Sequence, residues 1–238
     1  MSKTLLSLIM TFQLGISFGQ QSEIINTDRP DQSDGTYTLT KKYLQIENGI
    51  TALNGSFQNN LMLRYGITNS TEIRLLFDFE KNSQSLGLTP IGLSLKQKLV
   101  RGNEIIPDIT FVTYLRNGNL ASKDFRDENY SYSLLLAFQN TINDNFSIGY
   151  NLSSNNINNN IGFTTSLGYS FNKKITAFVE YFSQFNTLQL PEHNVDGGLL
   201  YLHKNNLQFD IAIGKSLTAS NNLLYLTTGI SYKLKLHN

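Results

Sequence analysis

Charged side chains recur at alternate positions within apolar stretches of this 238-residue sequence. Glu72 and Arg74, for example, alternate with Ile73 and Leu75. Because successive side chains of a β-strand point to opposite faces, this spacing collects the charges on one face and the apolar side chains on the other. Acidic and basic groups confined on one face can form ion pairs or, where water reaches them, line a polar passage. The residues expected on the charged face are Glu47, Arg64, Glu72, Arg74, Asp78, Lys96, Lys98, Glu180 and Asp210.

These charges support two interpretations, which the residues alone leave open. In the first, they form a structural network of ion pairs that fills the interior, because an unpaired buried ion is costly whereas a paired, hydrogen-bonded one can persist. In the second, they line a pore and tune its selectivity. A closed β-barrel of intermediate size could follow either course, since eight-stranded barrels are filled by side chains and sixteen-stranded barrels are open.

The histidines offer little basis for catalysis. His193, His203 and His237 are the only ones, there is no cysteine, and none stands at the spacing of a metal site. His193 follows Pro191 in an expected loop, whereas a serine hydrolase needs a histidine beside its serine. The glycine motifs of phosphate and dinucleotide sites are absent, and a net charge of +1 gives no case for nucleic-acid binding. We therefore predict no enzyme activity, no catalytic residue, no metal site and no cofactor.

The elements that must position the charged residues are strands of roughly ten residues separated by turn residues. The clearest example lies near the C-terminal end, where Leu226, Ile230 and Leu234 alternate with small or polar residues such as Thr227 and Ser231. The same alternation predicts strands over residues 43–53, 57–65, 71–79, 91–99, 108–116, 130–139, 146–152, 161–171, 175–185, 195–202, 207–214 and 223–236.

This pattern predicts an all-β fold, an antiparallel transmembrane up-and-down β-barrel of about twelve strands with lipid outside and a polar lumen. A mean hydropathy of −0.22 agrees with it, because the average runs over an apolar outer face and polar lumen and loops. The remaining rival is a soluble lipocalin-like barrel, against which the expected signal peptide and last strand both count. The predicted alternation places Leu75 and Leu95 towards lipid and Ser94 towards the lumen. A polar replacement of Ser94 is therefore expected to have almost no effect on folding stability.

Three segments are expected. Residues 1–19 read as a secretory signal peptide, because Lys3 precedes an apolar core and Ser17 and Gly19 are small; the alternative is an uncleaved membrane anchor. Residues 20–42 are polar and lack an apolar period, which predicts a strap or plug segment before the barrel of residues 43–238. Export by the Sec route would deliver such a barrel to the bacterial outer membrane.

Several short motifs, in this order, resemble those of a known family. They are TDRPD at 27–31, YLQIENG at 43–49, RYG at 64–66, EIR at 72–74, GLSLK at 92–96, VEYF at 179–182, DGGL at 196–199 and QFD at 208–210. Together they resemble the outer-membrane transporter family associated with the meta-cleavage pathway of phenol degradation, over residues 27–234. The resemblance implies an outer-membrane β-barrel that takes up small solutes, aromatic or hydrophobic ones included.

The last predicted strand also resembles a recognition signal. Thr227, Gly229, Tyr232 and Leu234 are similar to the C-terminal signal that the outer-membrane assembly machinery recognises, although residues 235–238 extend past it and no terminal phenylalanine closes the strand. The expected partners are therefore outer-membrane lipid, the assembly machinery and a small-molecule solute.

The function predicted from these features is passive passage of a small solute through the barrel. The alternative is a plugged, non-conducting barrel with a structural or binding role. It arises because the polar segment that carries Asp28, Arg29 and Pro30 could fold back into the lumen.

Overall fold

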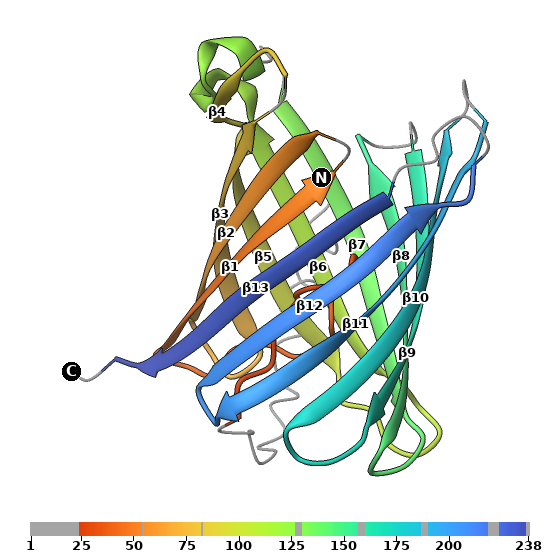
Figure 1. Ribbon diagram of the computed structural model, residues 1–238. Coiled ribbons are helices and arrows are strands. Elements are labelled where there is room, and N and C mark those ends of the chain that lie inside the picture. The colour runs from red at the N-terminus through yellow and green to blue at the C-terminus, as the bar shows by residue number, and fades with distance from the viewer. Residues whose placement is uncertain are drawn as a thin grey trace, which may run out of the picture.

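The chain forms a closed antiparallel β-barrel (Figure 1). The computed structural model describes residues 24–53, 55–81, 83–126, 130–156, 160–186, 190–218 and 224–236, so the predicted signal peptide lies outside the described residues. The barrel strands are β1 (Tyr43–Leu53), β2 (Ser56–Gly66), β3 (Thr71–Lys81), β5 (Ile91–Val100), β6 (Asp108–Asn117), β7 (Tyr130–Thr141), β8 (Phe146–Asn155), β9 (Asn160–Ser170), β10 (Ile175–Asn186), β11 (Glu192–Lys204), β12 (Leu207–Ser216) and β13 (Leu224–Lys235).

Each barrel strand pairs with its neighbours in sequence, and β1 pairs with β13 to close the ring. The closing register runs without a shift from Tyr43 opposite Lys235 to Leu53 opposite Tyr225. Closure leaves no strand edge with unpaired backbone groups, which is the condition for a sheet to cross a bilayer. The predicted up-and-down barrel of twelve long strands is therefore confirmed.

One short strand was not predicted. β4 (Leu86–Leu88) pairs with the end of β3, where Phe79 lies opposite Leu88, while β5 pairs with the earlier part of β3. Thr89 and Pro90 separate β4 from β5, and proline has no N–H to donate to a strand ladder. β4 and β5 thus share the place of one strand beside β3.

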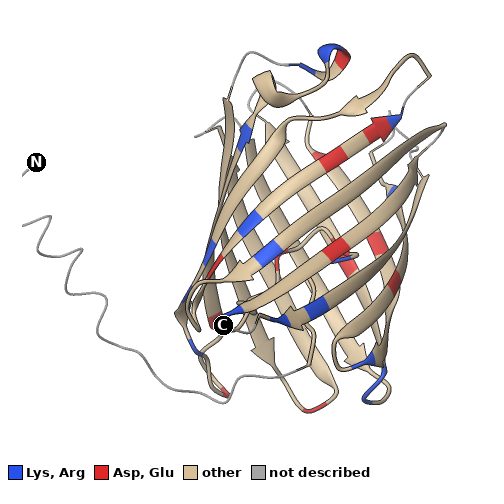
Figure 2. Cartoon of the chain, turned by 90° about the vertical axis from the view of Figure 1, so that its left-hand side faces the viewer, with Lys and Arg blue, Asp and Glu red and all other residues tan. Residues whose placement is uncertain are grey.

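The two faces of the wall have opposite character. Leu75 and Leu95 on the outer face are 40% and 41% exposed, whereas the neighbouring inward side chains of Arg64 and Arg74 are fully buried. Figure 2 shows acidic and basic residues on the same barrel, separated by long uncharged stretches of strand. Because a water-soluble protein would bury the leucines and expose the arginines, this inversion fits lipid outside and polar groups inside.

Among the described residues, no helix is long and apolar enough to cross a bilayer. The two helices present are single 3₁₀ turns, η1 (Gly118–Leu120) and η2 (Lys123–Phe125), which lie beyond the barrel rim near β4 (Figure 1).

The two ends of the barrel differ in their connections. At the end we call the short-turn end, residues 67–70, 142–145, 171–174 and 205–206 join adjacent strands. Asparagines fix some of these turns: Asn143 Oδ1 accepts hydrogen bonds from the backbone N–H groups of Asn145 and Phe146, both at 2.9 Å. The opposite, long-loop end carries β4 and residues 118–126, which follow β6. Residues 24–42 enter at the short-turn end, where Ile25 N donates to Asn205 O at 2.7 Å.

The outward direction of the Leu95 side chain, in the middle of β5, leads to a testable prediction. Leu95→Arg should lower the free energy of unfolding by about 2–4 kcal/mol, because it places a charge near the bilayer midplane. Urea unfolding in lipid vesicles, followed by heat-modifiable gel migration, measures the loss. The control is Ile105→Arg in the turn between β5 and β6, where the side chain is 87% exposed and the expected cost is about 0–1 kcal/mol. Equal losses in the two variants would contradict the assigned lipid face.

Candidate functional site

Residues 24–42, which we call the strap, run through the lumen and contact strands on several sides of the barrel. Their irregular backbone is satisfied by inward side chains of the wall. Asp28 N donates to Glu47 Oε2 at 3.2 Å, and Asp34 N donates to Asn151 Oδ1 at 2.9 Å. The backbone N–H of Leu39 donates to Glu72. Because buried backbone donors need partners, the polar lumen is what allows a segment without regular structure to lie there.

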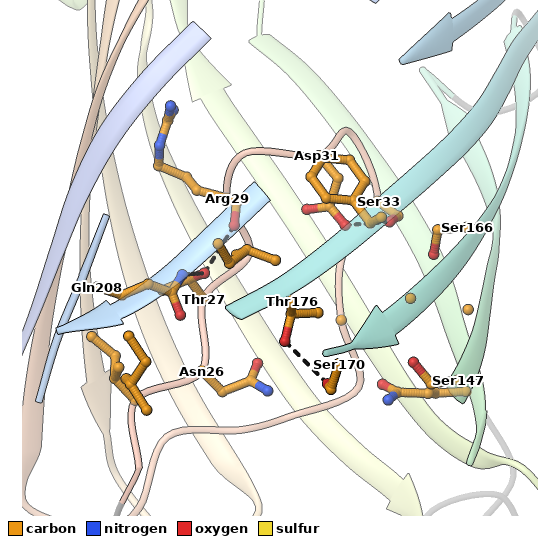
Figure 3. Close-up of a pocket in the computed structure, with 18 of the residues that line it drawn as sticks. Asn26, Thr27, Arg29, Asp31, Ser33, Ser147, Ser166, Ser170, Thr176 and Gln208 are labelled. Atoms are coloured by element: carbon orange, nitrogen blue, oxygen red, sulfur yellow. Dashed lines mark hydrogen bonds between the residues drawn. The ribbon is translucent and has the colours of Figure 1, made fainter. Parts of the chain in front are cut away.

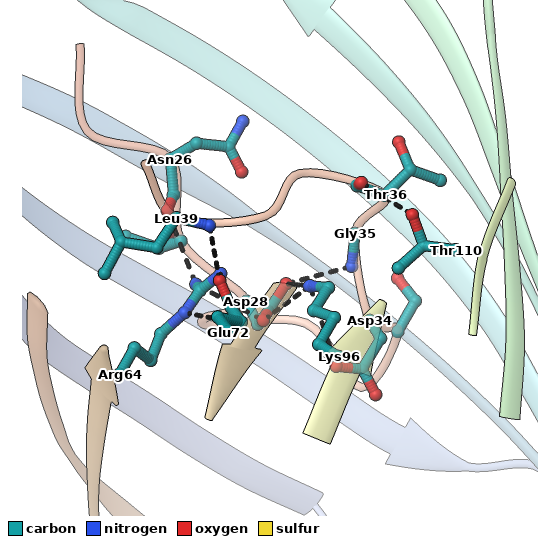
Figure 4. A network of polar contacts seen from close by, with 12 residues as sticks. Asn26, Asp28, Asp34, Gly35, Thr36, Leu39, Arg64, Glu72, Lys96 and Thr110 are labelled. Atoms are coloured by element: carbon teal, nitrogen blue, oxygen red, sulfur yellow. Dashed lines mark hydrogen bonds and ion pairs between the residues drawn. The ribbon is translucent and has the colours of Figure 1, made fainter. Parts of the chain in front are cut away.

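Asp28 is the centre of a buried ionic cluster (Figure 4). Its carboxylate lies 3.3 Å from Arg64 Nη1, 2.9 Å from Arg74 Nη1 and 2.8 Å from Lys96 Nζ. The side chains of these three cations are fully buried and that of Asp28 is 5% exposed. Burial alone would raise the pKa of Asp28, but the charges of Arg64, Lys96 and Arg74 hold that pKa below its usual range.

The cluster is completed by carboxylates from both the wall and the strap. Arg64 also pairs with Glu47 at 2.6 Å and with Glu72 at 3.0 Å, and Arg74 pairs with Asp34 at 2.8 Å. Three cations therefore face four carboxylates, two of which belong to the strap. Without the strap, the three cations would face only Glu47 and Glu72.

Arg29 attaches the strap to the seam where the barrel closes. Its Nη2 lies 3.4 Å from Asp210 Oδ1 on β12 and 2.9 Å from Thr227 Oγ1 on β13. The guanidinium lies against Gly49 and Gly229, which are opposite each other in the β1–β13 register. A Cβ at Gly229 would lie 2.6 Å from Arg29 Nε, so glycine leaves the space that the arginine occupies.

Between the strap and strands β7 to β12 lies a cavity of about 350 Å³ (Figure 3). Polar side chains of the cavity wall include Ser147, Ser166, Ser170, Thr176 and Gln208, and its apolar side chains include Phe178, Leu200 and Leu202. The charged lining residues are Arg29, Asp31 and Asp34 of the strap and Lys173 and Lys174 of the turn between β9 and β10. The volume is that of a small-molecule site, and the lining offers hydroxyl groups beside aromatic and aliphatic surface.

The residues predicted for the charged face fall into groups. Glu47, Arg64, Glu72, Arg74 and Lys96 meet around Asp28, while Glu180 and Asp210 contact the strap from the opposite wall. Asp78 and Lys98 lie outside the cluster and pair with other partners: Asp78 with Arg116 at 2.8 Å and Lys98 with Asp108 at 3.4 Å.

Several contributors were missed at the sequence level. Asn151 accepts from and donates to the backbone of Asp34, and Tyr114 donates its hydroxyl proton to Asp34 Oδ2 at 2.6 Å. Both stand at inward positions of their strands, which the alternation predicts, but neither carries a formal charge that marks it as a partner of the cluster. Asp34 and Asp196 were also left out of the predicted set.

The expectation for Ser94 is wrong for any large replacement. Ser94 is 1% exposed, and its hydroxyl accepts a hydrogen bond from Arg74 Nε at 3.1 Å. The Ser94 side chain faces the ionic cluster rather than open water. A charged side chain placed there would have no room and no partner.

The predicted assembly-signal residues Thr227, Gly229, Tyr232 and Leu234 all lie on β13, with Thr227 and Gly229 beside Arg29. Their role in assembly stays a prediction. Within the described ranges, no group of three or more His, Cys, Asp or Glu residues could hold a metal ion.

The ionic cluster makes a stability prediction. Asp28→Asn should cost about 3–5 kcal/mol of unfolding free energy, because Lys96 loses the carboxylate that accepts both of its short hydrogen bonds. Adding Lys96→Met should restore part of that loss, since it removes the buried cation whose remaining carboxylate partner, Asp34, lies 4.0 Å away. Urea unfolding in vesicles measures both variants. Asp78→Asn breaks a partly exposed pair and should cost less than about 1 kcal/mol; a cost equal to that of Asp28→Asn would argue against a special role for the cluster.

Comparison with known proteins gave one family and a set of similar folds. The family model described as "Putative MetA-pathway of phenol degradation" matches residues 27–234. No curated protein sequence matches. Among solved structures, the KdgM porin is 14% identical with a TM-score of 0.63, covering 81% of this chain and 99% of that one. The COG4313 outer membrane channel from Pseudomonas putida F1 is 12% identical with a TM-score of 0.61, covering 86% and 100%. The NanC porin is 10% identical with a TM-score of 0.59, covering 80% and 100%.

Proposed function

This chain belongs to the family described as "Putative MetA-pathway of phenol degradation", and from that premise we propose that it is an outer-membrane channel for passive passage of small solutes. The apolar outer wall supports residence in a bilayer, and a closed barrel of this kind suits the outer membrane of bacteria. The similar folds include porins and an outer membrane channel, which supports transport rather than catalysis.

The observation that carries the proposal is the cavity beside the strap. The strap is held against the β2, β3 and β5 side by the Asp28 cluster, so the space along β7–β12 stays available to a solute. A route past the strap needs no movement of the buried ion pairs, which would be costly to separate.

The lining of this cavity supports a small, weakly polar solute. Hydroxyl groups of Ser147, Ser166 and Thr176 can hydrogen-bond to a polar substituent, while Phe178 and Leu200 offer apolar surface. Aromatic or hydrophobic molecules are the solute class that the family's description suggests, and the mixed lining is compatible with them.

The second candidate is a plugged barrel with a structural or binding role. The observation that favours it is the number of attachments of the strap, which reach β1, β2, β3, β5, β8, β10 and β12. In that case the cavity would be a closed recess rather than a passage.

Conductance in planar bilayers separates the two candidates. The full-length protein should conduct, and deletion of residues 21–36 should raise the conductance because the strap then no longer narrows the lumen. The deletion should carry Lys96→Met, so that two cations remain against Glu47 and Glu72. Lys96→Met in the full-length chain is the control and should leave the conductance close to that of the parent. Heat-modifiable migration verifies folding. No conductance from either folded form would overturn the channel and favour the plugged barrel.

A further inference from the structure

We propose that the cavity beside the strap is a binding site for a small organic anion. The charged group of this solute lies at Lys173 and Lys174, and its apolar body packs along the inward side chains of β10 and β11. The proposal rests on the channel function proposed above, for which it names the class of solute more narrowly.

Two of the five charged residues that line the cavity are matched by partners outside its lining. Arg29 Nη2 lies 3.4 Å from Asp210 Oδ1, and Asp34 Oδ1 lies 2.8 Å from Arg74 Nη1. Each of these lining charges is therefore offset by a nearby charge of opposite sign and contributes little to the attraction of a solute.

The three charged lining residues that remain are Lys173, Lys174 and Asp31. Both lysines are exposed in the turn between β9 and β10, and none of the ion pairs among the described residues includes either of them. Asp31 accepts a hydrogen bond from Ser33 Oγ at 3.1 Å, and burial together with the charge of Glu180 raises its pKa well above the usual range. The Asp31 carboxyl therefore keeps its proton to a higher pH than usual and opposes an anion less, so the unmatched charge of the cavity is positive.

The short-turn end, which the cavity reaches at Lys173 and Lys174, is basic as a whole. Lys98 and Asp108 at this end pair with each other at 3.4 Å. The other acidic residues of its turns are Glu104 and Asp144, whereas the surface cations there include Lys41, Lys42, Arg101, Lys173, Lys174 and Lys204. A surface dominated by one sign of charge raises the local concentration of solutes of the opposite sign, so this end attracts anions towards the cavity.

The spacing along β10 fits a solute that carries one charged group and one ring. Lys174 immediately precedes β10, and the lining residues Thr176 and Phe178 follow it at inward positions of that strand. At about 3.3 Å per residue, they lie about 7 Å and about 13 Å along the strand from Lys174. Leu200 is directly opposite Thr176 in the β10–β11 register and adds apolar surface at the same level. A solute whose carboxylate meets the lysines therefore has its ring beside Leu200 and Phe178.

The opposite wall of the cavity leaves room for such a ring. On β8 and β9, Ser147 is directly opposite Gly168, and Gly149 is directly opposite Ser166. A Cβ at Gly149 would lie 2.7 Å from Ser166 Oγ, and one at Gly168 would lie 2.9 Å from Ser147 Oγ. The glycines thus leave space around two hydroxyl groups of the lining (Figure 3), which can donate hydrogen bonds to a carboxylate.

The test compares benzoate with benzamide, which has the same ring and nearly the same shape but no charge. Saturation-transfer NMR titrations of the full-length protein in neutral detergent, at low ionic strength and neutral pH, measure both affinities. Benzoate should bind at least about threefold more tightly, the size expected of two partly exposed ion pairs. The Lys173→Gln/Lys174→Gln variant should lose this preference, and heat-modifiable migration verifies its folding.

The matched control is Arg101→Gln/Lys204→Gln, which removes two exposed cations of the same end that do not line the cavity. This variant should keep the preference for benzoate, because the charged group of the solute does not contact either residue. A second readout is the permeability of benzoate relative to Na⁺, taken from zero-current potentials under a sodium benzoate gradient across planar bilayers. This ratio should exceed 1 in the parent and fall in Lys173→Gln/Lys174→Gln.

The outcomes are distinguishable from failure of the channel function, because binding in detergent does not require conduction. A conducting parent that binds benzoate and benzamide equally, or a lysine variant that keeps the preference, would overturn the anion site and leave the channel intact. An equal loss in the control variant would assign the preference to the general charge of this end and would also overturn the site. A folded parent that prefers benzoate but does not conduct would support the site and overturn the channel function.

Discussion

The arrangement of the lumen depends on the three cations that converge on Asp28. A barrel wall can hide its polar backbone by closing, but inward charges remain in a confined space where each must find a partner. Arg64, Arg74 and Lys96 are fully buried, and the effective cost of desolvating an ion is several kcal/mol. Two of the four carboxylates that offset this cost come from the strap. The strap is therefore part of the folded core of this barrel rather than an addition to it.

From this constraint follows the asymmetry of the lumen. The cations lie on β2, β3 and β5, so the acidic strap residues Asp28 and Asp34 face that wall. The strap reaches the opposite wall mainly through backbone N–H groups that donate to Glu180, and through Arg29. One wall thus holds the strap by a cluster of matched charges, and the other by one ion pair and several hydrogen bonds. The cavity is on the second side, where fewer ionic contacts occupy the space.

The sequence predicts the strands of the barrel wall better than it predicts the path and contacts of the strap inside the lumen. A two-residue period predicts both the presence of a strand and the face on which each of its side chains lies. The outward direction of Leu95 and the inward direction of Lys96 therefore follow from a local pattern. The alternation does not predict β4, because Thr89 and Pro90 interrupt the pairing beside β3 and divide one strand position into two. The strap has no period, and its partners are far away: Lys96 is 68 residues and Glu180 148 residues from the strap residues that they bind. Such pairings arise from barrel closure and have no local signal. Gly229, interpreted from the sequence as part of an assembly signal, has in addition a packing reason that appears only when Arg29 is placed against it.

The chemistry of the central side chains supports the structural interpretation of the lumen charges around Asp28. Arg64 donates from Nε and Nη2 to Glu72 and from Nη1 to Glu47, a set of directions that a lysine could not match. With most of its donors so engaged, the guanidinium is a fixed structural group and offers little to a passing anion. Asp196 is the reverse case, because its one short contact is to a neutral hydroxyl and its other oxygen has no hydrogen-bond partner. Lumen charges with a full set of partners and a carboxylate with an unpaired oxygen therefore coexist in one barrel, and the number of partners separates them rather than the sign of the charge.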